Sequence, residues 1–399
     1  MVNNRVGAVV RGPDFFGREE FMKLVSDSLK RNHILLAAPR RFGKTSVMYR
    51  LMDQPAWDYQ AIHLDAEDLE TPADFVAHLV EAAARKEGVR GLIDGMSDRA
   101  NHMIKVLRDN LDEVSIAKAK VKLRQDLKDE WQHQGRELCR RLANAGEPVV
   151  IFLDELPMMI ERMKGSESGK EEAKMLLRWL RAIRQRPEMS GLRFILAGSI
   201  GIEKVVNEIG ELASINDFYR IELPPFTHGI ADRFLCELAQ THQLDLPEES
   251  RTAMIQVVGV PVPYFLQVLF AEALKSCQIE GLSPSPDHVE RVYNERLLAV
   301  GCKTYFDYYY SRFRLYYPLH LERAAKCILR ELAPLPEGMT RDACYQFYHQ
   351  EAGQHTDQDE FHGLMADLEY EFYLRFDGNA RRYVFACKLL KDWWLRHYT

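Results

Sequence analysis

A segment near the amino terminus, Ala38–Ser46, carries a glycine, a lysine and two hydroxyl side chains at a spacing suited to phosphate binding. It follows an apolar run and precedes a helical pattern, so it would form the turn between a strand and a helix. Backbone N–H groups around Gly43 can converge on a phosphate at such a helix start. Lys44 would then reach the terminal phosphates of a nucleotide, and Thr45 would offer its hydroxyl to Mg²⁺. The segment therefore predicts a P-loop in which Ala38 replaces the first glycine of the usual pattern.

Two adjacent carboxylates, Asp154 and Glu155, follow the apolar run Val149–Leu153. Because side chains alternate along a strand, the two carboxylates should point in different directions. Asp154 would hold Mg²⁺, and Glu155 would polarise an attacking water as a general base. The alternative interpretations are an ordinary Gly-Lys-Thr turn and a strand that merely ends in a polar loop. The presence of both motifs in one chain disfavours these alternatives.

Five short apolar runs in the first half of the chain are the elements that would position these residues. Each run is almost continuously apolar, as in strands buried on both faces, and helical patterns lie between the runs. The runs are His33–Ala38, Gln60–Leu64, Val149–Leu153, Leu192–Gly198 and Tyr219–Leu223. An extra strand between the two motifs and a glutamate after the aspartate are typical of P-loop ATPases with the strand order 5-1-4-3-2. The predicted fold class is therefore α/β, with a parallel P-loop ATPase sheet.

A third polar position, Ser199, follows the run Leu192–Gly198. In the order 5-1-4-3-2 this fourth strand lies between the two motif strands. Ser199 would then sense the γ-phosphate or orient the attacking water. The alternative is that Ser199 caps the following helix.

The remainder of the chain is predicted to add two further domains. The strand pattern stops near residue 226, and residues 228–300 have a helical pattern. Residues 320–399 combine three helical patterns with a hairpin signal at Asp377–Asn379, which is typical of a winged helix. The predicted domains are an ATPase domain over residues 1–226, a helical lid over 227–302 and a winged-helix-like domain over 303–399.

Several short motifs occur along the chain in the order found in one family. Phe15–Glu20 is similar to an FxGRE box that precedes the P-loop, and Pro39–Thr45 is similar to a PRRxGKT loop. Val150–Glu155 looks like an hhhhDE strand, and Leu196–Ser199 looks like an xxGS sensor strand. Gly259–Tyr264 resembles the GxPxPY element of a helical lid. Together these motifs make the chain resemble the archaeal-type ATPases of the STAND branch, relatives of AAA+ proteins.

The resemblance implies a site for ATP and Mg²⁺ at the P-loop. Phe16, Gly17 and Arg18 would lie near the adenine. Either Pro261 or Pro263 would approach the nucleotide from the lid. The preference for adenine over guanine also rests on the resemblance, because the chain carries no clear NKxD motif.

The roles of Arg40 and Arg41 stay open at this point. They would stabilise phosphate charge, contact a neighbouring subunit or neutralise the acidic site. No arginine finger can be assigned, so catalysis would need a protein partner or a homo-oligomer. The implied nucleotide-binding residues are Phe16, Gly17, Arg18, Pro39, Arg40, Arg41, Phe42, Gly43, Lys44, Thr45, Ser46, Pro261 and Pro263.

The composition is that of an ordinary globular protein. The 399 residues are 46% hydrophobic and carry a formal net charge of −6, so no overall basic field attracts nucleic acid or an anionic membrane. No apolar stretch is long enough to cross a bilayer, and no signal core follows the first residues. Seven scattered cysteines without a CxxC pair favour free thiols and a cytoplasmic location.

Two features motivate DNA as a candidate partner, although it is not the favoured one. They are the winged helix and the basic cluster Lys118–Lys128. The segment 320–399 carries 10 Lys and Arg against 13 Asp and Glu, which favours a protein partner instead. The basic cluster is interpreted first as a solvated helical face. The aromatic-rich segment 303–317 is interpreted as a seam between domains rather than a base-stacking platform.

The sequence therefore supports three functions, ranked in order. The first is a Mg²⁺-dependent ATPase that acts as a conformational switch. The second is a DNA-binding ATPase that resembles an initiator or loader. The third is a scaffold that binds nucleotide without hydrolysing it, an alternative kept because of Ala38 and the missing arginine finger.

Overall fold

The computed structural model describes residues 2–92, 120–125, 127–198 and 201–399. By its internal contacts the chain divides into two compact units. The sheet unit comprises Glu19–Ala37 and Lys44–Leu223, and the helical unit comprises Met1–Arg18, Ala38–Gly43 and Pro224–Thr399. The chain thus passes from the helical unit into the sheet unit within the P-loop segment. The three-domain division drawn from the sequence stays a prediction.

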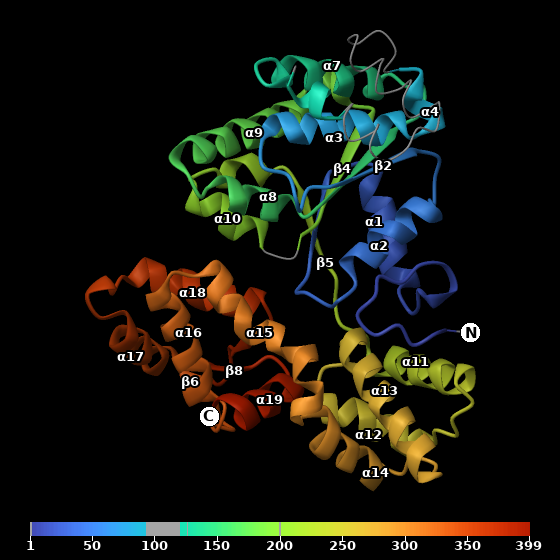
Figure 1. Ribbon diagram of the computed structural model, residues 1–399, viewed down its shortest axis with the longest axis vertical. Coiled ribbons are helices and arrows are strands. Elements are labelled where there is room, and N and C mark those ends of the chain that lie inside the picture. The colour runs from blue at the N-terminus through green and yellow to red at the C-terminus, as the bar shows by residue number, and fades with distance from the viewer. Residues whose placement is uncertain (1, 93–119, 126, 199–200) are drawn as a thin grey trace. The chain divides into compact units, whose positions relative to one another are not determined.

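A five-stranded parallel sheet forms the centre of the sheet unit (Figure 1). Its order is β2-β3-β4-β1-β5, which confirms the predicted order 5-1-4-3-2. All residues of β1 and β3 are buried, as the continuous apolar runs predict for strands covered on both faces. The strands are β1 Ile34–Ala37, β2 Gln60–Asp65, β3 Val149–Asp154, β4 Leu192–Leu196 and β5 Tyr219–Glu222.

Helices cover both faces of this sheet (Figure 1). Helix α9 illustrates why the helices pack on the sheet. Its apolar residues recur at helical spacing and form one buried face, which includes Ala173, Leu176, Leu180 and Ile183. The described helices are α1 Glu19–Leu29, α2 Lys44–Asp53, α3 Pro72–Ala84, α4 Glu87–Arg90, α7 Trp131–Ala143, α8 Leu156–Met163, α9 Glu167–Gln185 and α10 Ile202–Glu208. Short 3-10 turns lie at η2 Pro187–Met189 and η3 Leu212–Ile215.

Helix α3 begins at a capping box formed by Thr71 and Asp74. The Asp74 backbone N–H donates to Thr71 Oγ1 over 3.1 Å, and the Thr71 backbone N–H donates to Asp74 Oδ2 over 3.0 Å. Pro72 at the first helical position has its φ already set for the helix. This start fixes where α3 runs beside β2, the strand that precedes it.

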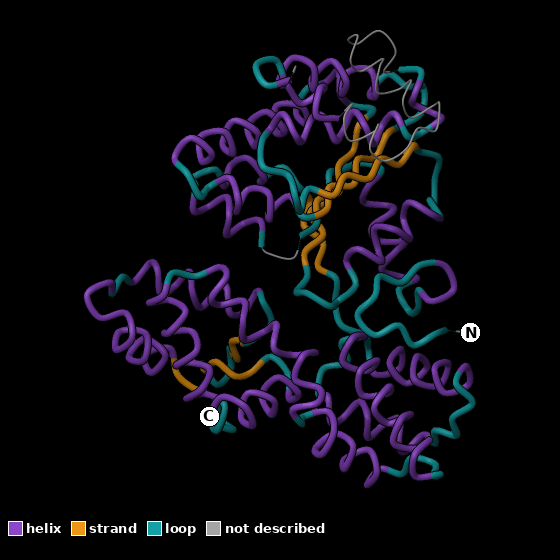
Figure 2. The backbone as a smooth tube through the Cα atoms, viewed as in Figure 1, coloured by secondary structure: helices purple, strands orange, loops and turns teal. Residues whose placement is uncertain are grey.

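The helical unit is built mostly from helices, in agreement with the loss of the strand pattern after residue 226 (Figure 2). Its first part holds η1 Gly12–Asp14, α11 His228–Thr241, α12 Glu248–Val258, α13 Pro263–Glu280, α14 Pro286–Val292, the π-helix η4 Tyr293–Leu297 and η5 Val300–Cys302. Its last part holds α15 Lys303–Tyr316, α16 Leu319–Leu332, α17 Arg341–Ala352, η6 Gly353–His355, α18 Gln358–Tyr370 and α19 Lys388–Tyr398.

A small antiparallel sheet completes this last part. Its order is β6-β8-β7, with β6 Met339–Thr340, β7 Leu374–Asp377 and β8 Arg382–Phe385. Asp377 Oδ1 accepts hydrogen bonds of 3.0 Å from the N–H groups of Asn379 and Ala380, which closes the predicted hairpin turn. The assignment of this part as a winged helix stays a prediction. We call residues 303–399 the C-terminal module.

Part of the aromatic segment on α15 lies in the interior of this unit. Phe306, Tyr309 and Phe313 are buried, and Phe306 contacts Trp393 with a ring-centroid distance of 6.0 Å. Tyr309 meets Tyr373 edge to face at 5.9 Å. Buried rings cannot stack on nucleic-acid bases, and the interpretation of the whole segment as a seam between domains stays a prediction.

No helix in the described parts of the chain has both the length and the apolar character needed to cross a membrane. All seven cysteines are free thiols, and all except Cys236 are buried.

Candidate functional site

The P-loop segment enters helix α2 through a glycine that its backbone requires. Gly43 has φ +99°, a conformation that residues with a Cβ rarely adopt. A Cβ built on Gly43 would meet no atom within 4 Å, so the residue leaves open space beside the loop. Ala38 does not have a positive φ, whereas Arg41 does, at 69°. The alanine at the first position therefore imposes no left-handed backbone strain on the loop.

The two predicted magnesium ligands lie within hydrogen-bonding distance in the sheet unit. Thr45 Oγ1 on α2 donates to Asp154 Oδ2 at the end of β3 over 3.1 Å. Asp154 is buried, and burial raises the pKa of its carboxyl group. The nearby Asp65 carboxylate also raises this pKa, while Thr45 and Lys44 act in the opposite direction. A desolvated carboxylate beside a hydroxyl oxygen has the oxygen-donor chemistry that suits Mg²⁺.

Glu155 lies just outside β3, so the alternation of side chains along a strand does not set the direction of the Glu155 side chain. Its φ is 55°, in the left-handed region, and it is the N-cap residue of α8. Its backbone N–H donates to the carbonyl oxygen of Ala197 over 3.0 Å and to Asp154 Oδ1 over 3.1 Å. These bonds hold a strained backbone at the carboxyl end of the sheet, where a non-glycine residue needs support from its surroundings.

The third polar position, Ser199, lies outside the described residues. Its predecessor Gly198 is described, and a Cβ built there would come within 2.6 Å of Pro157 Cγ. The end of β4 and the start of α8 therefore approach so closely that only glycine fits.

The box Phe16–Arg18 packs against helix α11 in the helical unit. Gly17 has φ +68°, and a Cβ on it would come within 2.4 Å of Ile230 Cγ2. The Phe16 ring contacts the Phe234 ring with a centroid distance of 5.6 Å. Both the conformation and the close approach require glycine at position 17.

Arg18 is buried and bound to backbone carbonyls. Its Nη1 donates to the carbonyl oxygen of Pro224 over 2.6 Å, and its Nη2 donates to that of Phe42 over 3.5 Å. Its guanidinium lies 4.6 Å from the centroid of the Phe226 ring. Burial lowers the pKa of Arg18 to about 10. The side chain therefore ties three segments of the unit together, a role that the sequence motif alone did not reveal.

The two prolines of the predicted lid, Pro261 and Pro263, have different environments. Pro261 is buried, and its carbonyl oxygen accepts a hydrogen bond of 3.1 Å from the N–H of Phe226, the residue stacked on Arg18. Pro263 is half-buried and is the first residue of α13. Pro261 is therefore the proline connected to the Phe16–Arg18 box.

The three residues before the P-loop glycine make aromatic contacts within the helical unit. These pairs are Arg40 with Tyr308, Arg41 with Tyr264 and Phe42 with Phe372. Sequence reasoning did not find these partners, because they lie far along the chain from the P-loop.

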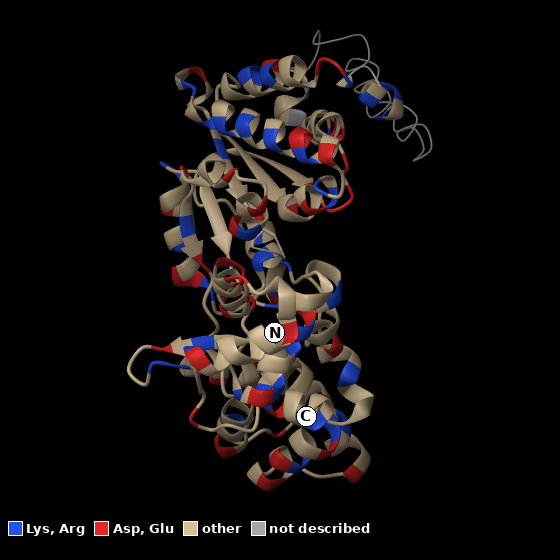
Figure 3. Cartoon of the chain, turned by 90° about the vertical axis from the view of Figure 1, so that its left-hand side faces the viewer, with Lys and Arg blue, Asp and Glu red and all other residues tan. Residues whose placement is uncertain are grey.

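Part of the basic cluster near residue 120 is paired with acidic groups on α3. Lys120 Nζ lies 2.6 Å from Glu81 Oε2, and Arg124 Nε lies 2.6 Å from Asp74 Oδ1. Figure 3 shows Lys and Arg residues interspersed with Asp and Glu over the chain. These pairs reduce the positive charge available for a nucleic-acid backbone.

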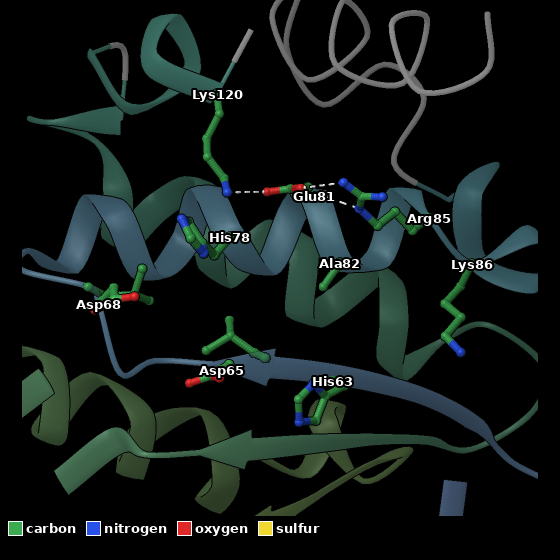
Figure 4. Close-up of a pocket in the computed structure, with 11 residues that line it drawn as sticks. His63, Asp65, Asp68, His78, Glu81, Ala82, Arg85, Lys86 and Lys120 are labelled. Atoms are coloured by element: carbon green, nitrogen blue, oxygen red, sulfur yellow. Dashed lines mark hydrogen bonds and ion pairs between the residues drawn. The ribbon is translucent and has the colours of Figure 1, made fainter. Parts of the chain in front are cut away.

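A cavity of about 460 Å³ lies between β2 and α3 in the sheet unit (Figure 4). Glu81 bridges Lys120 and Arg85 along its α3 side. Asp65 lines the opposite wall and pairs in register with Asp154 on the adjacent strand. The cavity therefore lies one strand away from the candidate magnesium ligand Asp154.

The sheet order, the strand–loop–helix segment and the aspartate at the end of β3 define the fold of a P-loop ATPase. No protein-family model and no curated protein matches the sequence. Among solved structures, the chain is similar to the Walker-type ATPase of Pyrococcus abyssi. The TM-score is 0.62 at 18% identity, covering 98% of this chain and 99% of that chain. This likeness supports the fold.

Two further solved structures are similar to the chain at lower scores. One is Cdc6p from Pyrobaculum aerophilum, with a TM-score of 0.43 and 13% identity over 98% of this chain and 94% of that chain. The other is the RuvB Holliday junction branch migration motor of Thermotoga maritima. Its TM-score is 0.44 at 11% identity, covering 93% of each chain.

Proposed function

We propose that the protein is a Mg²⁺-dependent ATPase of the STAND branch that acts as a conformational switch. The observation that carries the proposal is the 3.1 Å contact between Thr45 and the buried carboxylate of Asp154. A buried carboxylate is costly unless a cation or a donor compensates it. A hydroxyl and a carboxylate at the P-loop end of the sheet are the ligands that a nucleotide-bound Mg²⁺ uses.

The residues of the chain divide the work at this site. Bound Mg·ATP supplies the phosphoanhydride bond that water cleaves to give ADP and phosphate. Thr45 and Asp154 hold the cation, and Lys44 neutralises phosphate charge. Glu155 accepts a proton from the attacking water at a carboxylate oxygen, acting as a general base. Ser199 orients this water or senses the terminal phosphate.

The nucleotide base is assigned to the helical unit. Phe16 and Gly17 contribute to the adenine site, and Pro261 contributes from the lid. Arg18 supports this site indirectly, because its N–H groups bind the carbonyl oxygens of Pro224 and Phe42. Bound ATP would bias the orientation of the lid, which is the basis of the proposed switch.

A protein partner is favoured over DNA for the output of the switch. Helix α18 carries Asp359, Glu360, Asp367 and Glu369, so its field repels a phosphate backbone. The ion pairs of Lys120 and Arg124 also disfavour DNA, because they neutralise positive charge that could bind phosphate. A homo-oligomer would supply the arginine finger that the sequence does not assign.

Phosphate release under multiple-turnover conditions tests the proposal. The wild-type protein should release phosphate with Mg·ATP, and Glu155→Gln should reduce the rate by about 10²- to 10⁴-fold while nucleotide binding persists. Glu167→Gln, at an exposed position on α9, is the matched control and should retain the wild-type rate. Equal rates in Glu155→Gln and the wild type would exclude Glu155 as the base. Binding without any turnover by the wild type would instead support the scaffold alternative.

A further inference from the structure

Two of the residues before the P-loop glycine contact the C-terminal module directly. The Arg40 guanidinium lies 4.4 Å from the centroid of the Tyr308 ring on α15. The Phe42 ring meets the Phe372 ring edge to face, with a centroid distance of 5.1 Å and an interplanar angle of 81°. Phe42 is buried. These contacts connect the loop that would cradle phosphate to a part of the chain more than 250 residues away.

The residue between them contacts the lid helix instead. The Arg41 guanidinium lies 4.6 Å from the centroid of the Tyr264 ring on α13. Arg41 Nη1 also donates to the carbonyl oxygen of Gly7 over 3.1 Å. Three consecutive P-loop residues thus contact the lid and the C-terminal module through two cation–π contacts and one edge-to-face ring contact. The strength of such contacts depends on the orientation of each side chain.

The two contact points on the C-terminal module are joined to each other. Arg312 lies one helical turn after Tyr308, and its guanidinium is 5.1 Å from the centroid of the Tyr308 ring. Arg312 is buried and forms an ion pair with Glu371, with Nη2 and Oε1 3.2 Å apart. Glu371 is the neighbour of Phe372 in the chain. The module therefore presents Tyr308 and Phe372 to the P-loop as one connected surface.

Backbone strain is present at both ends of this connection. Arg41 has φ 69° and Phe372 has φ 67°, in a region that bulky side chains rarely occupy. In addition, Arg40 Nε and the Tyr308 hydroxyl are buried and find no hydrogen-bond partner among the described residues. Backbone strain of this kind clusters at ligand clamps and switch regions, and buried polar atoms without partners are rare in native structures. Both features occur along this set of contacts, although on different residues.

We propose that Arg40, Arg41 and Phe42, together with Tyr308, Tyr264 and Phe372, form a latch that couples the P-loop to the lid and the C-terminal module. The coupling rests on the proposed ATPase function. A phosphate bound beside Gly43 and Lys44 attracts the two arginines of the same loop, and charge–charge attraction competes with their contacts to the rings. Nucleotide binding therefore changes the latch, and the latch transmits the change to the C-terminal module.

Hydrogen exchange of the nucleotide-free full chain tests whether the latch exists. Tyr308→Leu removes the ring face but keeps an apolar side chain, and Tyr308→Phe keeps the ring. Exchange of the amides at residues 40–43 should be at least about fivefold faster in Tyr308→Leu than in the wild type. It should stay near the wild-type rate in Tyr308→Phe.

A matched control on the same helix separates the latch from general loosening of the module. Tyr310 stacks on Tyr398 with a centroid distance of 3.7 Å, and both rings belong to the C-terminal module. Tyr310→Leu should leave exchange at residues 40–43 unchanged. Wild-type exchange at residues 40–43 in Tyr308→Leu, or equal acceleration in Tyr310→Leu, would overturn the latch.

A second measurement tests the coupling with the probe Mg·ATPγS. In the wild type this nucleotide should change exchange at residues 371–374 by about fivefold or more, and in Tyr308→Leu by less than about twofold despite retained binding. A wild-type response in Tyr308→Leu would overturn the coupling. If the wild type binds no nucleotide, the proposed function and the coupling both fail. The contact itself is then judged by the nucleotide-free comparison.

Discussion

The hydroxyl of Thr45 donates a hydrogen bond of 3.1 Å to the carboxylate of Asp154, although 109 residues separate the two in the chain. The first residue stands at the start of α2 and the second at the end of β3. In the sheet, β4 lies between β1 and β3. Helix α2 follows β1, so the contact between Thr45 and Asp154 spans the position of β4. The strand order thus positions the candidate metal ligands.

Asp154→Asn should weaken Mg²⁺-dependent nucleotide binding. The amide keeps an oxygen for Thr45 but lacks the charge that a divalent cation requires, so the dissociation constant for Mg·ATP should rise at least about tenfold. Binding of a fluorescent nucleotide, with and without Mg²⁺, measures this. Asp58→Asn, at an exposed loop position, should behave as the wild type. A Mg²⁺ response that survives in Asp154→Asn would remove this residue from the metal site.

Arg18→Met should destabilise the helical unit. Methionine fills much of the same space but leaves the carbonyl oxygens of Pro224 and Phe42 without the donors they have now. The expected loss is about 1–3 kcal/mol in the free energy of unfolding. Urea denaturation followed by circular dichroism measures it, with the exposed Arg31→Met as control. Unchanged stability of Arg18→Met would show that the carbonyl contacts are dispensable.

His33 should make stability depend on pH in the acid range. Burial and the nearby Arg184 lower the pKa of His33 from 6.5 to about 4, and its Nδ1 accepts a hydrogen bond of 3.2 Å from the N–H of Phe194. Between pH 6.5 and 4 the unfolded chain binds a proton that the folded chain does not. Stability should therefore fall as pH falls through this window, by about 2–3 kcal/mol.

The comparison of His33→Gln with the wild type isolates this contribution. Thermal unfolding from pH 7 to pH 4 should show a smaller decrease in stability for His33→Gln than for the wild type. His228→Gln, at an exposed position on α11, is the control. If the stability of His33→Gln and of the wild type decreased equally with falling pH, the assignment of this pH dependence to His33 would be wrong.

The sheet and its order could be predicted from the sequence because each strand is a continuous apolar run. The run His33–Ala38 contains β1, and Val149–Leu153 contains all but the last residue of β3. The pairing of Thr45 with Asp154 also follows, since the carboxyl ends of parallel strands meet at one edge of a sheet.

The direction of Glu155 could not be predicted in the same way. The expectation used strand alternation, but Glu155 has left the strand and adopts φ 55°. This conformation depends on hydrogen bonds to Ala197 and Asp154, which a linear pattern does not contain.

The partners of Arg40 and Arg41 could not be predicted for a related reason. A cation–π pair requires a ring from a distant segment, and the sequence offers many tyrosines without indicating which one is near. In the structure Arg40 contacts Tyr308 and Arg41 contacts Tyr264, and both contacts can be tested by substitution.

Titration calorimetry with Mg·ATP is the measurement that tests the central claim most directly. The wild type and Lys23→Ala, an exposed lysine on α1, should give the heat of one-site binding, and Lys44→Ala should give none. Absence of heat with the wild type, or equal heat with Lys44→Ala, would contradict the assignment of the P-loop as the nucleotide site.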